Sequence, residues 1–382
     1  MTNRELFHAT MLRENGDKLL HFEQGFNINR EEWIAEGLPD TIVTDGWPRI
    51  EGGDLYEHMN VAGYAYCRFE QFCLPRFEQR ILEETQDCRI EISGNGVTRK
   101  VMTQGHGSPP HELDFAIKTP RDYEENRHRL TGNIEQRIDH DWLAANAEKL
   151  RAQPHHPVTL FVHGPFAFLR ELVGTENAMI LPYTEPDMIR CMLRDHLEKS
   201  MAAAKPVIEA CKPDMCFVWE DCCGSTGPFI APDIFASTMA PWYREWKEYL
   251  VSMGVPWIML DTDGDPGPLV RQWYEAGVDC LQPWEVNSVD MLQFAEAFPE
   301  YVMMGGIYKH MFEPGDPAQV GRFKSRNLFD AIDGELERIV APMVKRGGYI
   351  AALDHWAFWG TTYNGYRHYT EQLAKYGKAN HT

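Results

Sequence analysis

The stretch PWIMLDTDGDPGPLVRQWYEAGVDCLQPWEV, residues 256–286, contains two apolar runs separated by a helical segment. The first run ends in a polar, glycine-containing sequence, and the helical segment has proline near its first turn, where proline is tolerated. This order of run, helix and run predicts two parallel strands joined by a helix. Similar apolar runs with polar ends occur at residues 18–25, 158–165, 214–224, 301–309 and 347–356.

These seven strand candidates, with helices between them, favour a (β/α)8 TIM barrel over an open, doubly wound sheet. No GxGxxG fingerprint follows any run, which also argues against a dinucleotide-binding sheet. We expect the eighth strand within residues 55–150, where residues 88–102 look like a β-hairpin that turns at Gly94-Asn95-Gly96 and residues 105–115 look like a loop. The sequence predicts a single α/β barrel domain over residues 1–382, with an N-terminal insertion of antiparallel strands at about 50–150.

Composition and charge exclude several classes of protein. At 382 residues, with 43% hydrophobic and 25% charged residues, the chain can bury a core. The formal net charge is -20 and no run is rich in Lys or Arg, so no nucleic-acid partner is expected. The start is polar, no stretch of about eighteen apolar residues follows, and the nine cysteines form no CxxC pair. We therefore expect a cytoplasmic protein that does not bind membranes.

The carboxyl ends of the predicted strands carry ionisable side chains. In a TIM barrel these ends form the active site. In chain order the residues there are Glu23, His163, Glu220, Asp221, Asp261, Asp263, Glu285, Lys309, Asp354 and His355. Each alone could cap a helix or pair with a neighbour, but together they predict one site at a shared rim. Because acidic residues outnumber basic ones there, we expect a divalent cation or a cationic substrate.

Asp261 and Asp263 are candidate metal ligands. In an extended segment, residues two positions apart point to the same side, so both carboxylates are expected to face one ligand. The distant His355 could complete three ligands, a set compatible with zinc. The short DxDG pattern also occurs in calcium loops, but the remaining EF-hand pattern is absent from the sequence.

Six motifs occur in order along the chain: HGPFAFLRELVGTENAMILPYTEPDMI, EDCCGSTGPFIAPDIF, LDTDGD, GVDCLQPWEV, MGGIYK and GGYIAALDH. With these motifs, residues 156–376 and, more faintly, the N-terminal part resemble the uroporphyrinogen decarboxylase superfamily, which contains decarboxylases and corrinoid-dependent methyltransferases. True uroporphyrinogen decarboxylases have an Arg-Gln-Ala-Gly-Arg stretch that binds porphyrinogen carboxylates, whereas this chain has HFEQGFNINREEW at residues 21–33. The resemblance therefore implies the methyltransferase-like branch and its TIM barrel.

Two correspondences with relatives concern the site. His355 falls where the decarboxylases have the histidine of a Gly-His-Gly motif. The zinc methyltransferases of the superfamily hold their metal with a His-x-Cys pair and a distant Cys, which correspond here to Asp261, Asp263 and His355. Each position keeps a residue that can bind metal. This set of oxygen and nitrogen ligands suits polarising an oxygen better than activating a thiol.

The resemblance implies metal-assisted methyl transfer. We expect a methyl group to move from a small donor, either a methoxylated aromatic that undergoes O-demethylation or a methylamine, to a corrinoid. No Asp-x-His-x-x-Gly corrinoid motif is present, so the cobalamin is expected on a separate protein. A zinc ion would stabilise the leaving group. Glu220 and Glu285 are predicted acid/base groups or alternative ligands, and His163 and Lys309 are predicted to orient substrate.

Aromatic residues follow His355 in the sequence. Trp356, Phe358 and Trp359 are predicted to line the substrate site, although aromatic clusters are more often part of a core. The other predicted substrate-binding residues are Glu23, Asp221 and Asp354.

Two alternative functions remain open. The first is a metal-free decarboxylase or lyase that acts on a small carboxylated substrate, with His355 and an aspartate moving protons. The second is a non-catalytic barrel that binds a small ligand or a corrinoid protein. A homodimer is a further open option. Metal content separates the first alternative from the methyltransferase, and turnover separates the second.

Overall fold

The computed structural model describes residues 1–103, 110–319 and 321–377. Within them, eight parallel strands form one curled sheet, in the order β1, β14, β13, β12, β11, β8, β7, β2. Their bounds are β1 Leu20–His21, β2 Ala65–Cys67, β7 Val158–His163, β8 Met215–Trp219, β11 Trp257–Asp261, β12 Cys280–Gln282, β13 Val302–Met304 and β14 Tyr349–Ala351. All seven predicted runs contain a strand of this sheet, and β2 lies in the range expected for the eighth.

The two outermost strands, β1 and β2, approach each other without pairing as strands. An isolated parallel bridge joins Phe22 and Ala62, where Ala62 N donates to His21 O at 2.9 Å and Glu23 N donates to Ala62 O at 2.9 Å. From β2 to β14, neighbours in the sheet follow chain order, as in a (β/α)8 fold. The predicted α/β class with a curled parallel sheet is confirmed.

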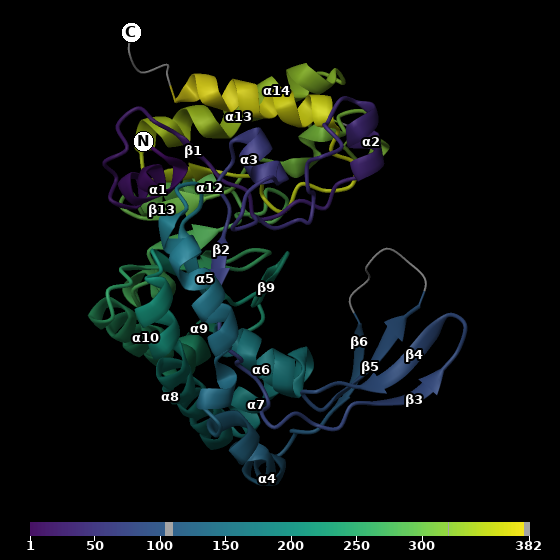
Figure 1. The fold of residues 1–382 in the computed structure, drawn as a ribbon, viewed down its shortest axis with the longest axis vertical. Coiled ribbons are helices and arrows are strands. Elements are labelled where there is room, and N and C mark those ends of the chain that lie inside the picture. The colour runs from purple at the N-terminus through teal and green to yellow at the C-terminus, as the bar shows by residue number, and fades with distance from the viewer. Residues whose placement is uncertain (104–109, 320, 378–382) are drawn as a thin grey trace.

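Helices between the strands cover the outside of the sheet (Figure 1). The helices are α1 Asn3–Met11, α2 Arg30–Ala35, α3 Leu55–Met59, α4 Pro120–Thr131, α5 His140–Ala152, α6 Pro165–Val173, α7 Thr175–Thr184, α8 Pro186–Cys211, α9 Pro232–Ile234, α10 Ala240–Ser252, α11 Gly267–Glu275, α12 Met291–Ala297, α13 Leu328–Arg346 and α14 Tyr363–Tyr376. Side-chain caps fix several starts: Asn327 accepts from two backbone N–H groups of α13, and Thr362 accepts from Gly365 N in α14. Within the described residues, no helix is long and apolar enough to cross a membrane.

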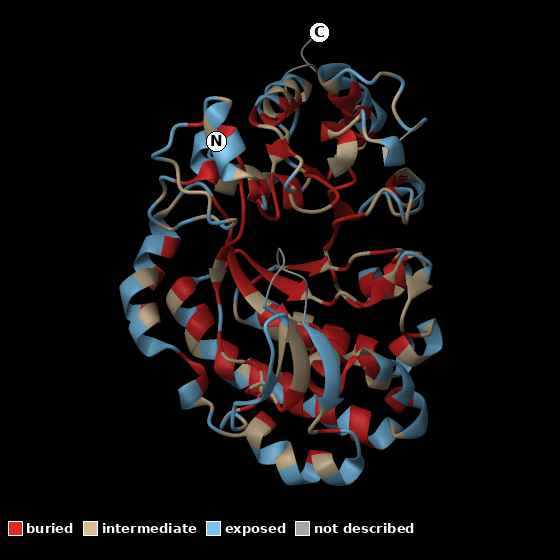
Figure 2. Cartoon of the chain, turned by 90° about the vertical axis from the view of Figure 1, so that its right-hand side faces the viewer, coloured by how far each residue is buried: buried red, intermediate tan, exposed pale blue. Residues whose placement is uncertain are grey.

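Apolar side chains pack on both faces of the curled sheet. Val162, Val218 and Leu260 belong to the large cluster between the strands and the helices. Phe217 and Met259, which alternate with them along the strands, belong to a smaller cluster that fills the inside of the sheet. Figure 2 shows the buried strands at the centre and helices that expose their outer faces. This interior leaves only the strand ends for polar chemistry.

A four-stranded antiparallel sheet projects to one side of the molecule (Figure 1). Its strands are β3 Arg80–Glu84, β4 Cys88–Ile92, β5 Val97–Met102 and β6 His111–Phe115. The pair β4 and β5 is the hairpin predicted for residues 88–102, which is confirmed. The predicted loop at 105–115 is wrong at its end, where β6 forms, and residues 104–109 of that prediction lie outside the described residues. Because β6 is mostly exposed, no alternation of apolar residues marked it as a strand.

Candidate active site at the carboxyl ends of the parallel strands

The last residues of four neighbouring strands form one layer at the end of the curled sheet. His163 ends β7, Trp219 ends β8, Asp261 ends β11 and Gln282 ends β12, and each is in register with the next. Residues in register on parallel strands point to the same face. The layer beneath them, two positions earlier on each strand, contains Phe161, Phe217, Met259 and Cys280. The four strand-end residues, which we call the mouth layer, therefore lie at the open end of the interior.

Asp261 is held by its neighbour in the mouth layer. Gln282 Nε2 donates to Asp261 Oδ1 at 2.7 Å, and no hydrogen bond to Oδ2 is found within the part of the chain described. Burial raises the pKa of Asp261 well above its ordinary value, and the negative charges of Asp263, Asp221 and Glu285 raise it further. These four carboxyl groups, which we call the acidic group, therefore favour a shared proton or a bound cation.

Asp263 and His355 face each other in this region. His355 Nε2 lies 3.7 Å from Asp263 Oδ2. Burial, followed by the charges of Glu285 and Asp221, raises the pKa of Asp263 to about 7, although Lys309 opposes this shift. Burial and the charge of Lys309 lower the pKa of His355 to about 4. Near neutral pH the pair consists of a half-protonated carboxyl group and a neutral imidazole, which suits proton transfer.

One glycine allows the LDTDGD loop to place these groups. Gly264 has φ +78°, and a Cβ there would lie 2.5 Å from Gly224 O, so this turn requires glycine. Gly264 N donates to Glu285 Oε2 at 2.9 Å, which holds Glu285 against the loop. Asp265 Oδ1 accepts from the first backbone N–H of α11 at 2.9 Å. Asp265 therefore caps the next helix, and Asp263 remains at the mouth.

Asp354 joins the loops that follow β12 and β13. Its Oδ1 accepts from Lys309 N at 2.9 Å and its Oδ2 accepts from Val286 N at 3.1 Å. Burial raises the pKa of Asp354 to about 6, and these two hydrogen bonds oppose the shift. Both oxygens contact the backbone, which places Asp354 as a support for Lys309. In the described ranges Lys309 Nζ forms no ion pair, and it acts on Asp263 and His355 through its charge.

Two predicted site carboxylates are fully buried among structural groups. Glu220 accepts from two backbone N–H groups at the N-terminus of α6, at 3.3 and 3.4 Å, and burial raises its pKa to about 7. Glu23 Oε1 lies 3.0 Å from His21 Nε2 and accepts from the hydroxyls of Tyr366 and Tyr369 at 3.3 Å, and burial raises its pKa. These contacts place Glu220 as a support for α6 and Glu23 as an anchor for α14.

A glutamine fixes His163 in the mouth layer. Gln71 Oε1 accepts from His163 N at 2.7 Å and lies 3.4 Å from His163 Nδ1. Burial and the charges of Lys199 and Arg170 lower the pKa of His163 to about 3, so the ring is neutral at ordinary pH. The ring packs edge-on against Trp219, with 5.1 Å between centroids. His163 can therefore orient a ligand through shape and hydrogen bonding, without charge.

Aromatic rings continue from His163 around one side of the mouth. The ring contacts, with centroid distances, are Trp356 to Trp47 4.8 Å, Trp47 to Tyr66 5.7 Å, Tyr66 to Phe161 5.6 Å, Phe161 to His163 5.1 Å and His163 to Trp219 5.1 Å. We call these six residues the aromatic arc. Of the predicted aromatic residues, only Trp356 belongs to the arc: Phe358 contacts His310, with 4.8 Å between centroids, and Trp359 is 53% exposed.

Sequence reasoning missed several of these residues. Trp219 carries a usable signal, because it is the last residue of an apolar run and directly precedes Glu220. Gln282 carries another, because it is a polar residue inside an apolar run. Gln71, Trp47 and Tyr66 lie in the poorly patterned region before residue 150, where no apolar run or spacing indicates them.

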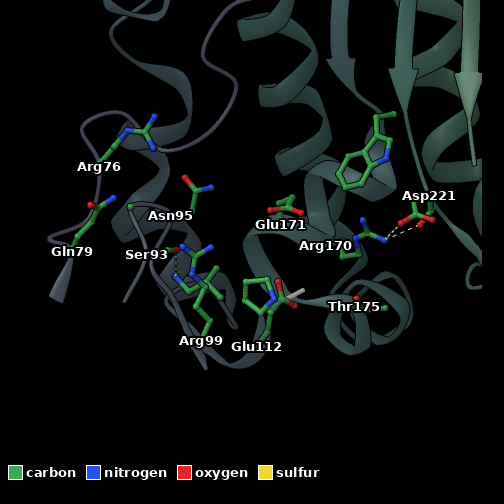
Figure 3. A pocket seen from close by; sticks show the side chains of 14 residues that line it. Arg76, Gln79, Ser93, Asn95, Arg99, Glu112, Arg170, Glu171, Thr175 and Asp221 are labelled. Atoms are coloured by element: carbon green, nitrogen blue, oxygen red, sulfur yellow. Dashed lines mark hydrogen bonds and ion pairs between the residues drawn. The ribbon is translucent and has the colours of Figure 1, made fainter. Parts of the chain in front are cut away.

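A cleft of about 700 Å³ opens beside Asp221, between the end of the parallel sheet and the insertion (Figure 3). Arg170 Nη1 donates to Asp221 Oδ2 at 2.7 Å and to Asp221 O at 3.0 Å, and the guanidinium lies 4.9 Å from the Trp219 ring centre. The insertion contributes Arg99 and Glu112 to the wall. Asp221 thus faces a cavity of a size that holds small ligands, and its charge is paired with Arg170.

The predicted zinc ligands do not form a ready-made metal site. Among the residues that the structure describes, no group of three or more His, Cys, Asp or Glu side chains is arranged to hold a metal ion. Asp263 and His355 are close enough to share a ligand, but Asp261 Oδ1 is occupied by Gln282. Zinc at these three residues would have to bind Asp261 through Oδ2, and because the described side chains are not arranged as a metal site, no step of a reaction is assigned to a metal.

Comparisons with known proteins concern the fold. No family model matches the chain, and no curated protein matches it. Among solved structures, the chain is similar to a methyltransferase from Methanosarcina mazei, with a TM-score of 0.57 and 16% identity over 98% of this chain and 99% of that chain. A Bacillus subtilis mannanase gives a TM-score of 0.33 and 12% identity over 61% of this chain and 71% of that chain, which is too weak for any argument. The first similarity shows that this chain shares the fold of that structure over 98% of its length.

Proposed function

We propose that this protein is a methyltransferase that moves a methyl group from a small donor, of the methoxylated aromatic or methylamine type, to a corrinoid carried by a separate protein. The observation that carries the proposal is the mouth layer, in which a neutral histidine, a tryptophan, a carboxyl group and an amide end four adjacent strands. Such a site suits a small, partly apolar molecule. The fold shared with the Methanosarcina methyltransferase supports the same class.

The residues of the chain have separable tasks in this reaction. The aromatic arc and the apolar layer beneath it exclude water from the donor. With a methoxy donor, the bond between oxygen and methyl carbon breaks with its electron pair on oxygen, and the protonated form of Asp263 donates a proton to that oxygen. Neutral His355, 3.7 Å away, accepts and returns protons between Asp263 and solvent. The corrinoid supplies the nucleophile when its protein docks.

We also propose that the curled sheet closes as a (β/α)8 barrel of the uroporphyrinogen decarboxylase type. The bridge between Phe22 and Ala62 supports closure, because it joins the two edges of the sheet. The antiparallel sheet β3–β6 then decorates a single domain, at the place predicted for the insertion. A separate corrinoid protein would have to reach the open end of this barrel, where the mouth layer lies.

Methyl transfer is tested with the purified chain and a small corrinoid protein reduced to the cob(I)alamin state. We expect cob(I)alamin to be consumed when a donor from a panel of methoxylated aromatics and methylamines is added, as followed by visible absorbance. The same mixture without donor is the control. Release of carbon dioxide from small carboxylated compounds, without methyl transfer, would establish the decarboxylase alternative. Ligand binding without either reaction would favour the non-catalytic barrel.

Zinc binding is a separate proposal with its own prediction. We expect zinc added to metal-free protein to raise the melting temperature and release protons, because the ion binds ionised carboxylates and neutral imidazole. His355→Ala should lose this effect, whereas Asp187→Asn, which changes a side chain that is 91% exposed, should keep it. A melting temperature unaffected by zinc, in a sample shown to be metal-free by elemental analysis, would contradict zinc binding and favour a metal-free decarboxylase or lyase.

A further inference from the structure

We propose that the mouth binds a small methylated ammonium ion that carries at least one N–H group, and that this ion is the methyl donor. The assignment as donor rests on the proposed methyl transfer, whereas binding of the ion does not. Three features of the mouth support this proposal: two carboxyl groups without a cationic partner, a buried oxygen without a hydrogen-bond donor, and a wall of aromatic rings.

Two carboxyl groups of the acidic group have no cationic partner among the described residues. Asp221 is paired with Arg170, and Glu285 accepts from Gly264 N. Among the described residues, Asp261 forms no ion pair, and Asp263 has only the neutral His355 within reach. Lys309 acts on Asp263 from a longer distance. A monovalent cation placed beside Asp261 and Asp263 would favour their ionised forms and would then be attracted by both carboxylates.

Gln282 has an unpaired side-chain oxygen, which favours a ligand that donates a hydrogen bond. Its side chain is 1% exposed, and its Nε2 is bound to Asp261. Within the described residues its Oε1 is buried without a hydrogen-bond partner. Leaving such a group unpaired is unfavourable, so a ligand that donates a hydrogen bond there is favoured. An ammonium N–H can donate to Gln282 Oε1 or to Asp261 Oδ2. A methoxy oxygen, which only accepts, cannot.

The aromatic arc provides surfaces for the methyl groups. Trp219 is in register with Asp261 on the neighbouring strand, so its ring lies beside this carboxyl group. Aromatic faces attract methylated ammonium ions. One side of each nearby ring is already used, because Arg170 lies over Trp219, Tyr66 stacks on Tyr64 and Phe161 stacks on Phe217, so the ligand would contact the opposite sides. A hydrated metal ion would gain little from these rings.

Binding is tested by isothermal titration of the full chain at constant ionic strength. The probes are trimethylammonium, tetramethylammonium and the neutral, similarly sized tert-butanol. We expect trimethylammonium to bind saturably. Tetramethylammonium should bind about tenfold more weakly, because it has no N–H for the two acceptors. The alcohol should show no saturable binding, because it lacks the charge that the carboxylates and rings attract.

Variants separate the contributions of charge and hydrogen bonding. Asp261→Asn should weaken trimethylammonium binding at least about tenfold, because it removes the nearest charge. Gln282→Leu should weaken trimethylammonium but leave tetramethylammonium unchanged, because only the former donates to the amide oxygen. Asp187→Asn, which also removes one carboxylate but from an exposed position, should change the binding of neither ion. Circular dichroism and melting curves verify that each variant is folded.

The outcomes of binding and of turnover are distinguishable. Absence of saturable trimethylammonium binding by the folded wild type, or equal binding of tert-butanol, would overturn the inference. Methyl transfer from methoxylated aromatics in a protein that binds no ammonium ion would also overturn it while supporting the proposed function. Ammonium binding that follows the variant pattern, without methyl transfer from any donor, would support the site and refute the proposed function.

Discussion

Replacing Asp261 with asparagine is expected to slow methyl transfer by about a thousandfold while the fold stays intact. The amide oxygen can still accept from Gln282 Nε2, which lies 2.7 Å from Asp261 Oδ1, so the shape of the mouth layer is kept. What is lost is a carboxyl group that can ionise beside a bound ligand. Because burial and the charges of Asp263, Asp221 and Glu285 disfavour its ionised form in the empty protein, the melting temperature should stay the same or rise by about 1–3 °C.

Initial rates of corrinoid methylation and melting curves of the same samples measure the two effects. Asp187→Asn serves as the control, because it also removes one carboxylate but from an exposed position. Asp261→Asn with the rate of the wild type would show that Asp261 takes no part in the reaction. A melting temperature lowered by several degrees would instead show that the carboxyl group stabilises the fold, as a capping residue would.

The parallel strands could be predicted because each lies in an apolar run that ends in a polar or glycine-containing segment. β2, Ala65–Cys67, could not be located within residues 55–150, because the antiparallel strands of the insertion follow it where the repeating pattern would place a helix. All five residues of β3 are exposed, so that strand has no buried face for the sequence to mark. The hairpin of β4 and β5 was identifiable from its turn, since Gly94-Asn95-Gly96 permits a tight reversal.

Position at a strand end predicts that a side chain is near the mouth, but the direction of the side chain depends on tertiary contacts. Asp261 and Asp263 remain at the mouth. Glu220, which follows β8, instead contacts the N-terminus of α6, the helix that follows the preceding strand, β7. No local pattern encodes that contact. Trp219 and Gln282 were overlooked for a different reason: neither ionises, and a search for charged strand ends passes over an amide and an indole.

Stability is expected to respond most strongly to Glu220→Gln, in a pH-dependent manner. Burial raises the pKa of Glu220 from 4.5 to about 7 in the folded protein. The folded state therefore holds this proton more tightly than the unfolded state, and the contribution of Glu220 to wild-type stability falls as pH rises from about 4.5 to about 7 and then levels off. Glutamine does not ionise. Relative to wild type, the free energy of unfolding of the variant should rise by up to about 3 kcal/mol across this range.

Urea unfolding at a series of pH values measures this difference. His163 and His355 have lowered pKa values, so their contribution makes stability rise with pH up to about 6.5, but they are present in both proteins and cancel. At low pH the variant should be no more stable than wild type. There the protonated carboxyl group of Glu220 is neutral, and the amide of the variant accepts from the same two backbone N–H groups of α6. Glu135→Gln, at a side chain that is 88% exposed, is the matched control for the loss of one carboxylate. A difference for Glu220→Gln that does not change with pH would mean that Glu220 ionises freely in the folded protein, and its role as a buried support for α6 would be wrong.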